Sequence, residues 1–374
     1  MILLFILIPC TIYFLSLYFF LNGLKFNNVS YKNSKTNFLP NISIIVCIRN
    51  GGNSVKNILN DLIKQTYEGD IEFLIVDDES EDSTSETILE FVHIDKRFKY
   101  LNSNFHNTAL SHKKRALYAG IEHAKSEWLL FTDVDCRISK DWVTSMVKYY
   151  SYSDYVIGFS YVEENSSIVS RFQSIDFNML MFSALSSVLQ KYPLASTGQN
   201  QSYKKSLYTK VGGFKKIEHL LQGDDSIFLQ LCNNNINVSF AEDCRAHVKA
   251  KTHNKWKEFL LQRVRWAGDA NIMWKYNKKF FIIILSSFLA NISLIVVSFL
   301  AIFYFEFLIL LTLIILIKLF LEFSIYLRGC NRLNRKKHIN SFLIWFLIQP
   351  IYILLMGVLS FYSNKINWKG RIIN

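Results

Sequence analysis

The sequence contains few cysteines, and none of them has the spacing of a metal site or a disulfide framework. The six are Cys10, Cys47, Cys136, Cys232, Cys244 and Cys330. Structural zinc is marked by cysteines a few residues apart, and small secreted folds carry dense cysteine patterns. Both classes are therefore excluded, and we expect reduced cysteines in a domain that faces the cytosol.

Several nucleotide and nucleic-acid motifs are also missing. The chain has neither the G-x-G-x-x-G fingerprint of dinucleotide-binding folds nor the G-x-x-x-x-G-K-[ST] loop of P-loop enzymes. It has no zinc-finger spacing or helix-turn-helix pattern, although its formal net charge is +12. Much of this charge flanks apolar segments, as is typical of the cytoplasmic ends of membrane helices. We therefore expect no nucleic-acid partner.

Apolar runs long enough to cross a bilayer occur at both ends of the chain. The first, residues 1–21, lacks the basic start and small-residue cleavage site of a signal peptide, so we expect an N-terminal anchor. A C-terminal membrane region of about three segments is expected in residues 280–363, followed by a basic tail at 364–374. Within this region Lys318 and Glu322 are four residues apart and are expected to neutralise each other inside the bundle.

The basic residues predict an orientation in the plasma (inner) membrane. Lys25, Lys32 and Lys35 follow the first apolar run, which predicts an outside amino terminus and a cytoplasmic location for residues 22–279. Four crossings would put the carboxyl terminus outside. Pro350 inside the last run and the basic tail favour the inside instead, so the side of the tail stays open.

Residues 40–270 alternate between predicted strands and amphipathic helices. The strands are Ile42–Ile48, Ile71–Val76 and Trp128–Thr132, and the helices are Val55–Lys64 and Lys113–Ala124. This alternation predicts an α/β domain with a Rossmann-like sheet between flanking helices. Ligands of such sheets bind beyond the carboxyl ends of the strands. Phe172–Leu189 is predicted to be an interfacial or core helix.

Polar residues follow these strands at the edge where a ligand is expected. Two carboxylates spaced like Asp133 and Asp135 suit Mg²⁺ or Mn²⁺, which take their remaining ligands from a diphosphate and water. Asp77 and Asp78 either cap the next helix or accept hydrogen bonds from a nucleobase or ribose. Arg49 follows the first strand at the same edge.

Three further features each have two interpretations. Lys113 opens a helix whose basic start is either a solvated face or a diphosphate contact. Asp224 and Asp225 precede an apolar helical pattern, where acids favour the helix dipole, and one of them is also suited to act as a general base. Gln262–Trp266 lies just before the second apolar region, either as an interfacial helix or as an acceptor-binding segment.

Together these clusters resemble the membrane-integrated family 2 glycosyltransferases, which include ceramide glucosyltransferases and, more distantly, cellulose, chitin and hyaluronan synthases. The matching segments are Ser43–Asn50, Gln65–Tyr67, Val76–Ser80, His112–Leu117, Asp133–Cys136, Val211–Phe214, Gly223–Asp225, Gln262–Trp266 and the tail Trp368–Arg371. Gln262–Trp266 is an unaltered Q-x-x-R-W. Glu79 and His112 stand where the family usually has glycine, which leaves the local backbone in question.

The resemblance implies a GT-A fold and an inverting transfer from a nucleotide sugar, with UDP as the expected nucleotide. The resemblance implies that Asp77 or Asp78 binds the nucleobase, with Arg49 and Lys113 nearby. It implies that Asp133 and Asp135 hold the diphosphate and its Mg²⁺ or Mn²⁺. Asp225, beside Asp224, is the implied general base that deprotonates the acceptor, and the implied acceptor side at the bilayer consists of Gln262, Arg265 and Trp266.

The remaining alternatives for an enzyme differ in the molecule that accepts the sugar. Processive polysaccharide synthases usually thread their polymer through many helices, and four candidate segments are few for such a channel. A lipid or lipid-linked acceptor is therefore favoured over a polysaccharide. A non-catalytic membrane scaffold with this fold and a small transporter are the rivals from other classes. The first is disfavoured because every acidic position is filled, and the second because the charged groups lie outside the apolar runs.

Overall fold

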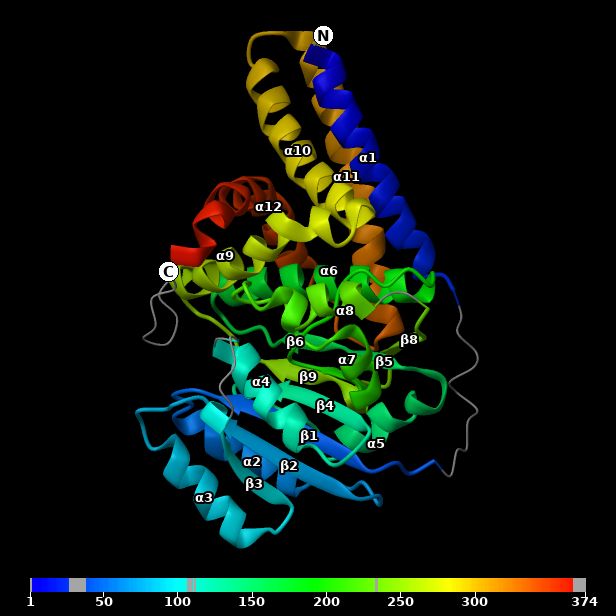
Figure 1. Cartoon of the computed structure of the whole chain (residues 1–374). Helices are drawn as coiled ribbons and strands as arrows, with labels where there is room; N and C mark the ends of the chain where they lie inside the picture. The colour runs from blue at the N-terminus through cyan, green and yellow to red at the C-terminus, as the bar shows by residue number, and fades with distance from the viewer. Residues whose placement is uncertain (1, 27–37, 106–109, 111, 233–234, 366–374) are drawn as a thin grey trace.

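The computed structural model describes residues 2–26, 38–105, 110, 112–232 and 235–365. A sheet domain lies at one end of the molecule and a bundle of long helices rises from the other (Figure 1). Lys32, Lys35 and the tail segment Trp368–Arg371 lie outside the described residues.

The core of the sheet domain is a seven-stranded mixed sheet with the order β3-β2-β1-β4-β7-β5-β8. Its strands are β1 (Ile42–Ile48), β2 (Ile71–Asp77), β3 (Phe98–Asn102), β4 (Trp128–Asp133), β5 (Tyr155–Gly158), β7 (Gln201–Lys204) and β8 (Val238–Ala241). The first four run parallel, whereas β7 is antiparallel to both β4 and β5. A second, two-stranded sheet pairs β6 (Ser160–Val162) with β9 (Val248–Ala250). The predicted α/β fold class is confirmed.

The central strands form where the sequence has continuous β-branched and aromatic runs. Such runs suit a strand that is buried on both faces, and β1 has six of its seven residues buried. The helices of the domain are α2 (Asn53–Ile63), α3 (Thr84–Ile94), α4 (His112–His123), α5 (Trp142–Val147), α7 (Lys205–Val211) and α8 (Ser226–Cys232). The three predicted strands are present, and two of them extend by one residue to include Asp77 and Asp133.

The site edge is set by the position of β1 between β2 and β4. The chain runs outward from β1 through β2 to β3 and then returns to place β4 on the other side of β1. Ile48 pairs with Asp77 and Cys47 pairs with Asp133, so both acidic strand ends flank the end of β1. Such a reversal of strand order opens a crevice at the carboxyl ends of the strands.

Among the residues that the structure describes, four helices are long and apolar enough to cross a membrane. They are α1 (Ile2–Gly23), α10 (Lys278–Leu300), α11 (Phe305–Arg332) and α12 (Ile339–Leu359). They correspond to the predicted apolar runs and indicate an integral membrane protein. In Figure 1, α1, α10 and α11 stand side by side, whereas α12 lies lower, close to α9 (Trp256–Ile272).

A buried polar cluster joins three of these helices. The predicted ion pair is present, with Lys318 Nζ 2.8 Å from Glu322 Oε2. Tyr13 of α1 donates a hydrogen bond to Glu322, and Lys318 donates one to Gln349 of α12. Charges inside a membrane are tolerated when they are paired and hydrogen-bonded in this way.

Both ends of α12 contact the side of the molecule that carries the sheets. At its start, Ser341 Oγ donates to Glu164 Oε2 at 2.8 Å. At its end, Asn271 of α9 donates to Ser360 Oγ at 2.9 Å, and the turn η7 (Ser360–Lys365) packs along α9. Pro350 lies inside α12, where it removes a backbone donor and kinks a helix. The helix therefore returns toward the sheets.

Two helices form the layer between the sheets and the bundle. The predicted helix at Phe172–Leu189 is part of α6 (Ile168–Leu189), which packs on α1, α11 and α12 and is mostly buried. Ser186 Oγ donates to Phe20 O at 2.6 Å, which fixes the end of α1 to α6. The second helix of the layer is α9.

A buried ion pair joins the two helices of this layer. Arg263 of α9 is 3% exposed, and its guanidinium lies 2.9 Å from Asp176 Oδ2 of α6. The same guanidinium lies over the rings of Phe177, Phe259 and Trp266 at 5.5, 5.0 and 4.3 Å. Cation–π contacts of this kind contribute about 0.5–2 kcal/mol each. Arg263 therefore holds Trp266 and α9 against α6.

Removing one partner of this pair is expected to have unequal effects. Burial, opposed by Arg263, raises the pKa of Asp176, so the carboxyl group can become neutral, but an arginine cannot. Asp176→Asn should therefore cost about 3–5 kcal/mol of stability, because it leaves a buried cation unpaired. Arg263→Met should cost less. Thermal unfolding in detergent measures both losses of stability. The control is Glu163→Gln, which removes the acid of an exposed ion pair and should cost under about 1 kcal/mol. Equal losses for the two buried variants would contradict this account.

Candidate active site

The carboxyl ends of β1 and β4 open into a cavity of about 180 Å³ that is closed on one side by α9. Every predicted site residue except Asp77 lines this cavity. The predicted residues in the lining are Arg49, Asp78, Lys113, Asp133, Asp135, Asp224, Asp225, Gln262, Arg265 and Trp266. The fold thus brings together residues that are more than 200 positions apart in the sequence.

Lys113 connects the acids of two different loops. Its Nζ lies 2.9 Å from Asp133 Oδ1 and 3.2 Å from Asp224 Oδ2. Burial alone would lower the pKa of Lys113, but Asp133 and Asp224 outweigh it and raise the pKa well above its usual value. The ammonium group therefore stays charged and neutralises part of the negative charge of the cavity.

The acids at the end of β4 and just beyond it fit a divalent cation. Asp133 and Asp135 both line the cavity and offer carboxylate oxygens, the ligands that Mg²⁺ and Mn²⁺ prefer. The described residues contain no group of three or more His, Cys, Asp and Glu residues arranged to hold a metal. Two carboxylates suffice where a diphosphate completes the coordination.

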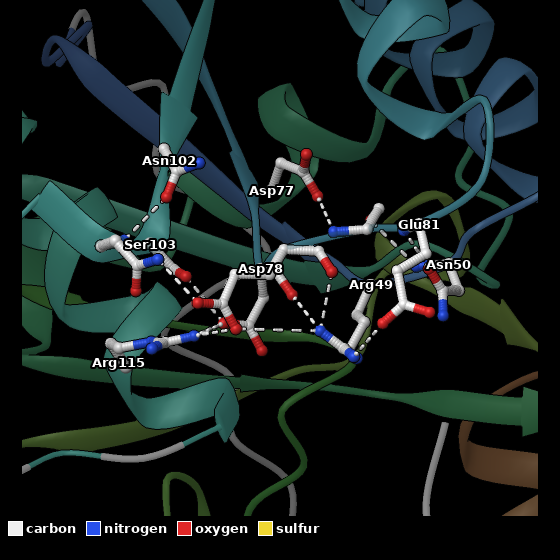
Figure 2. Close-up of polar contacts among 11 residues, drawn as sticks. Arg49, Asn50, Asp77, Asp78, Glu81, Asn102, Ser103 and Arg115 are labelled. Atoms are coloured by element: carbon white, nitrogen blue, oxygen red, sulfur yellow. Dashed lines mark hydrogen bonds and ion pairs between the residues drawn. The ribbon is translucent and has the colours of Figure 1, made fainter. Parts of the chain in front are cut away.

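Figure 2 shows the turn after β2, where Asp78 and Arg49 meet. The Asp78 carboxylate accepts hydrogen bonds from Ser103 Oγ at 2.7 Å and Arg115 Nη2 at 2.8 Å. Arg49 Nη1 donates to the backbone oxygens of Asp78 and Glu79, each at 2.8 Å. Arg49 thus fixes the turn that positions Asp78 at the cavity.

Asp77 lies outside the cavity lining. Its Oδ1 accepts a hydrogen bond from the Ser80 backbone N–H at 3.0 Å, and its Oδ2 accepts one from Tyr100 Oη at 3.1 Å. The carboxylate thus closes the turn before α3. Of the two acids predicted to bind the nucleobase, Asp78 is the one that faces the cavity.

The two positions where glycine was expected keep a glycine-like backbone. Glu79 has φ 58° and His112 has φ 54°, both in the left-handed region. This conformation costs a non-glycine residue roughly 1–2 kcal/mol. Glu79 regains part of that cost through its ion pair with Arg115 at 2.9 Å. Both positions therefore keep the left-handed backbone conformation that glycine would adopt there.

The basic start of α4 is neither a solvated face nor a uniform ligand contact. Lys113 faces the acids of the cavity, whereas Arg115 pairs with Asp78. Lys114 is buried and donates hydrogen bonds to the backbone oxygens of Ile217 and Leu220. Three successive side chains therefore serve three purposes, which depend on the elements packed around α4.

Asp225 is held by backbone donors in a position suited to a base. Its Oδ2 accepts a hydrogen bond from the Gly198 N–H at 3.1 Å, and its Oδ1 accepts one from the Ser226 N–H. Burial, reinforced by the neighbouring Asp224, raises the pKa of Asp225 to about 6. A carboxylate with this pKa is ionised at neutral pH yet is a better proton acceptor than an ordinary aspartate.

One face of α9 covers the cavity. Gln262, Arg265 and Trp266 are three and four residues apart, so they lie on one side of the helix and line the cavity together. Gln222 Nε2 donates to the Arg265 backbone oxygen at 2.7 Å, which joins α9 to the loop before Asp224. Burial lowers the pKa of Arg265 from its usual value.

A second cavity of about 250 Å³ lies on the other side of Asp224 and Asp225. We call it the bundle cavity. It shares Asp224, Asp225 and Trp266 with the first cavity and continues past Phe177 of α6 to helices α1 and α10. Most of its side chains are apolar. Asp225 thus lies where a polar crevice meets an apolar passage toward the membrane helices.

Sequence reasoning missed several residues of these two cavities. Thr197, Gly198 and Gln199 come from the loop before β7, and Asp269 lies one helical turn beyond Trp266 on α9. A β-carbon on Gly198 would lie 2.9 Å from Lys113 Nζ, so the loop approaches the site closely. The short polar run around Gly198 was the available signal, but nothing in its spacing joins it to the acids.

A seven-stranded mixed sheet with acids at its switch point is typical of the GT-A fold, and a comparison with solved structures agrees. The mannosyltransferase PcManGT from Pyrobaculum calidifontis, solved in complex with GDP-Man and Mn²⁺, superposes with a TM-score of 0.65. The alignment covers 97% of this chain and 99% of that one at 14% identity, a likeness that shows the fold.

Sequence comparison finds similarity to one family over part of the chain. Residues 43–214 match the family described as Glycosyl transferase family 2. The glycosyltransferase GlyA of Streptococcus pneumoniae is 29% identical over 36% of this chain and 21% of its own length. A poly-beta-1,6-N-acetyl-D-glucosamine synthase of Staphylococcus epidermidis is 26% identical over 67% of this chain and 59% of its own. The chain thus spans less than two thirds of each relative. Residues 43–214 are thus similar to glycosyltransferase family 2, and long hydrophobic helices follow them in the C-terminal part of the chain.

Proposed function

We propose that the protein moves a sugar from a nucleoside diphosphate sugar, with UDP as the expected nucleotide, onto a membrane lipid with inversion at the sugar. The observation that carries this proposal is the meeting of two unlike cavities at Asp225. The polar one is lined by strand-end acids and Lys113, and the apolar one leads to α1 and α10. A soluble donor and a lipid acceptor require such a pair of approaches.

The polar cavity is the proposed donor site. Asp78 accepts hydrogen bonds from the nucleoside, and Asp133 and Asp135 hold the diphosphate with Mg²⁺ or Mn²⁺. When bound, the cation neutralises charge on the departing diphosphate. Lys113, which pairs with Asp133 and Asp224 in the structure, supplies a further positive charge beside that leaving group.

Asp225 is the proposed general base. It removes the proton from the acceptor hydroxyl as the oxygen attacks C1 of the sugar opposite the leaving diphosphate. A single displacement of this kind inverts the anomeric centre and requires no covalent intermediate on the enzyme. The Gly198 and Ser226 N–H groups fix the carboxylate, and the adjacent Asp224 sustains its raised pKa.

The helices around the apolar passage determine the proposed membrane placement. Three crossings by α1, α10 and α11, with α12 returning to the sheet side, would place the carboxyl tail on the same side as the catalytic domain. We propose that this side is the cytoplasm, where nucleotide sugars are made and where basic flanks such as Lys275 and Lys278 concentrate. Accessibility labelling of a cysteine introduced at Ser363 in sealed vesicles tests this placement.

Product analysis tests the function. The purified protein is incubated with radiolabelled UDP- and GDP-sugars, Mn²⁺ and lipid vesicles, and the organic extract is analysed by mass spectrometry. We expect labelled glycolipid carrying one or a few sugars. Long labelled polymer without labelled lipid would refute the lipid acceptor. Persistent donor binding without any transfer would favour a non-catalytic scaffold.

A polysaccharide acceptor is the second candidate, and one comparison favours it. The relative from Staphylococcus epidermidis is named as a polymer synthase and aligns over 260 residues. The polymer would have to leave through the bundle cavity, whose lining is mainly apolar and includes Phe280 and Ile284. Sugars are poorly matched to such walls, so lipid remains the favoured acceptor.

A further inference from the structure

The ionisable residues among the described lining of the bundle cavity are all acids. Asp224, Asp225 and Asp269 line it, and among its described lining residues there is no Lys, Arg or His. Its other polar lining consists of uncharged side chains such as Ser196 and Gln222. An acceptor group that enters this passage therefore meets carboxyl groups in a mostly apolar setting and no cation.

Asp269 lies deeper along the passage than the residues shared by both cavities. It lines the bundle cavity but not the polar cavity that is the proposed donor site. It follows Trp266 by one turn of α9. Within the described chain no side chain or backbone group is found to donate a hydrogen bond to its carboxyl group. Its nearest charged influences are Asp225, Asp224 and Lys114. Asp269 is half-buried in the lining, so its carboxyl group is available to form a hydrogen bond with a ligand in the passage.

The protonation state of Asp269 indicates which chemical group of a ligand would bind to it. Burial, followed by repulsion from Asp225 and Asp224, raises the pKa of Asp269 well above its usual value. The group is then a neutral carboxylic acid, which both donates and accepts a hydrogen bond. A hydroxyl group is the matching partner because it also does both.

We infer that the acceptor is an uncharged, hydroxyl-bearing lipid, held by Asp269 and deprotonated at Asp225, and that lipid phosphates are excluded as acceptors. This inference rests on the proposed lipid-directed transfer and names its substrate class. Asp269 is a positioning and specificity residue, whereas Asp225 takes the proton. The new bond joins the acceptor oxygen to C1 of the sugar, and the nucleoside diphosphate leaves with the bonding electron pair.

Two physical arguments favour a hydroxyl over a phosphate. A phosphate monoester carries about −1.5 to −2 charges at neutral pH, and the ionised Asp225, with no cation among the described lining residues, would repel it. A phosphate oxygen is also already ionised and requires no base. The backbone-held Asp225, with its pKa of about 6, is useful only for a group that must lose a proton, such as an alcohol.

A comparison of three lipid acceptors tests the inference. The full-length protein in phosphatidylcholine vesicles receives radiolabelled donor, Mn²⁺ and one of three acceptors: diacylglycerol, ceramide or polyprenyl phosphate. We expect at least one uncharged lipid to be glycosylated more than about tenfold faster than polyprenyl phosphate, since each factor of ten needs only about 1.4 kcal/mol of discrimination. Equal or faster transfer to polyprenyl phosphate overturns the inference and leaves lipid-directed transfer intact. Polymer alone, or no product from any lipid, refutes both.

Substitutions at Asp269 separate positioning from folding. Asp269→Asn keeps a neutral donor and acceptor, so the KM for the uncharged lipid should stay within about threefold. Asp269→Leu should raise that KM about tenfold while the KM for the donor stays unchanged. Asp269→Lys should shift the preference toward polyprenyl phosphate. Equal acceptor KM values for the Asn and Leu variants, with unchanged melting temperature, would overturn the role of Asp269.

Discussion

Asp225→Asn is expected to reduce sugar transfer by roughly 10²–10⁴-fold, the usual contribution of a general base. The amide has nearly the same size and still accepts hydrogen bonds from Gly198 and Ser226, but it cannot take a proton. Nucleotide binding should change little, because Asp78 and Asp133 remain in place. A transfer assay beside isothermal titration with nucleotide and Mn²⁺ measures both effects.

The exposed acid variant Glu218→Gln, outside both cavities, is the matched control and should retain full activity. The pH profile gives an independent check. Because Asp225 must be ionised to act, kcat/KM of the wild type should fall tenfold per pH unit below about 6 and level off above it. The residual activity of Asp225→Asn should lack this step. Full activity in Asp225→Asn would exclude it as the base.

Asp135→Asn is expected to have the second largest effect, through the cation. Loss of one of two carboxylate ligands should remove about 3–4 kcal/mol of transition-state stabilisation, or roughly 10²–10³-fold in rate. Unlike Asp225→Asn, this variant should also weaken nucleotide binding in the presence of Mn²⁺. Titration with nucleotide at several Mn²⁺ concentrations distinguishes the two variants.

Metal removal should reproduce the same loss. With EDTA, the wild type should bind nucleotide about as weakly as Asp135→Asn, and EDTA should have little further effect on the variant. The exposed Asp70→Asn, which lies away from the donor cavity, should behave like the wild type throughout. If EDTA weakens nucleotide binding equally in the wild type and Asp135→Asn, Asp135 is not a metal ligand.

The strands and long helices were predictable because their signals are local. A β-branched run such as Ile42–Ile48 can be buried on both faces only as an interior strand, and an uncharged run of about twenty residues has few stable places outside a membrane. The acids at Asp77 and Asp133 could be assigned to one edge because parallel strands align their carboxyl ends.

The different roles of neighbouring residues could not be predicted from the sequence in the same way. Asp77 and Asp78 are adjacent acids, yet one closes a turn and the other faces the cavity. Successive side chains of a strand or turn point in different directions, and only the surrounding packing decides which one meets a ligand. The same holds for Lys113, Lys114 and Arg115 at the start of α4.

Local chemistry in the sequence thus determined the class of fold, the apolar helices and the set of acids from which the site is built. The tertiary structure alone decided that α12 turns back, that Arg263 stacks on Trp266, and that Asp269 joins Asp224 and Asp225 along one passage. The reason is physical: these features depend on contacts between elements distant in sequence, and the spacing of residues along one chain does not encode the distances between them.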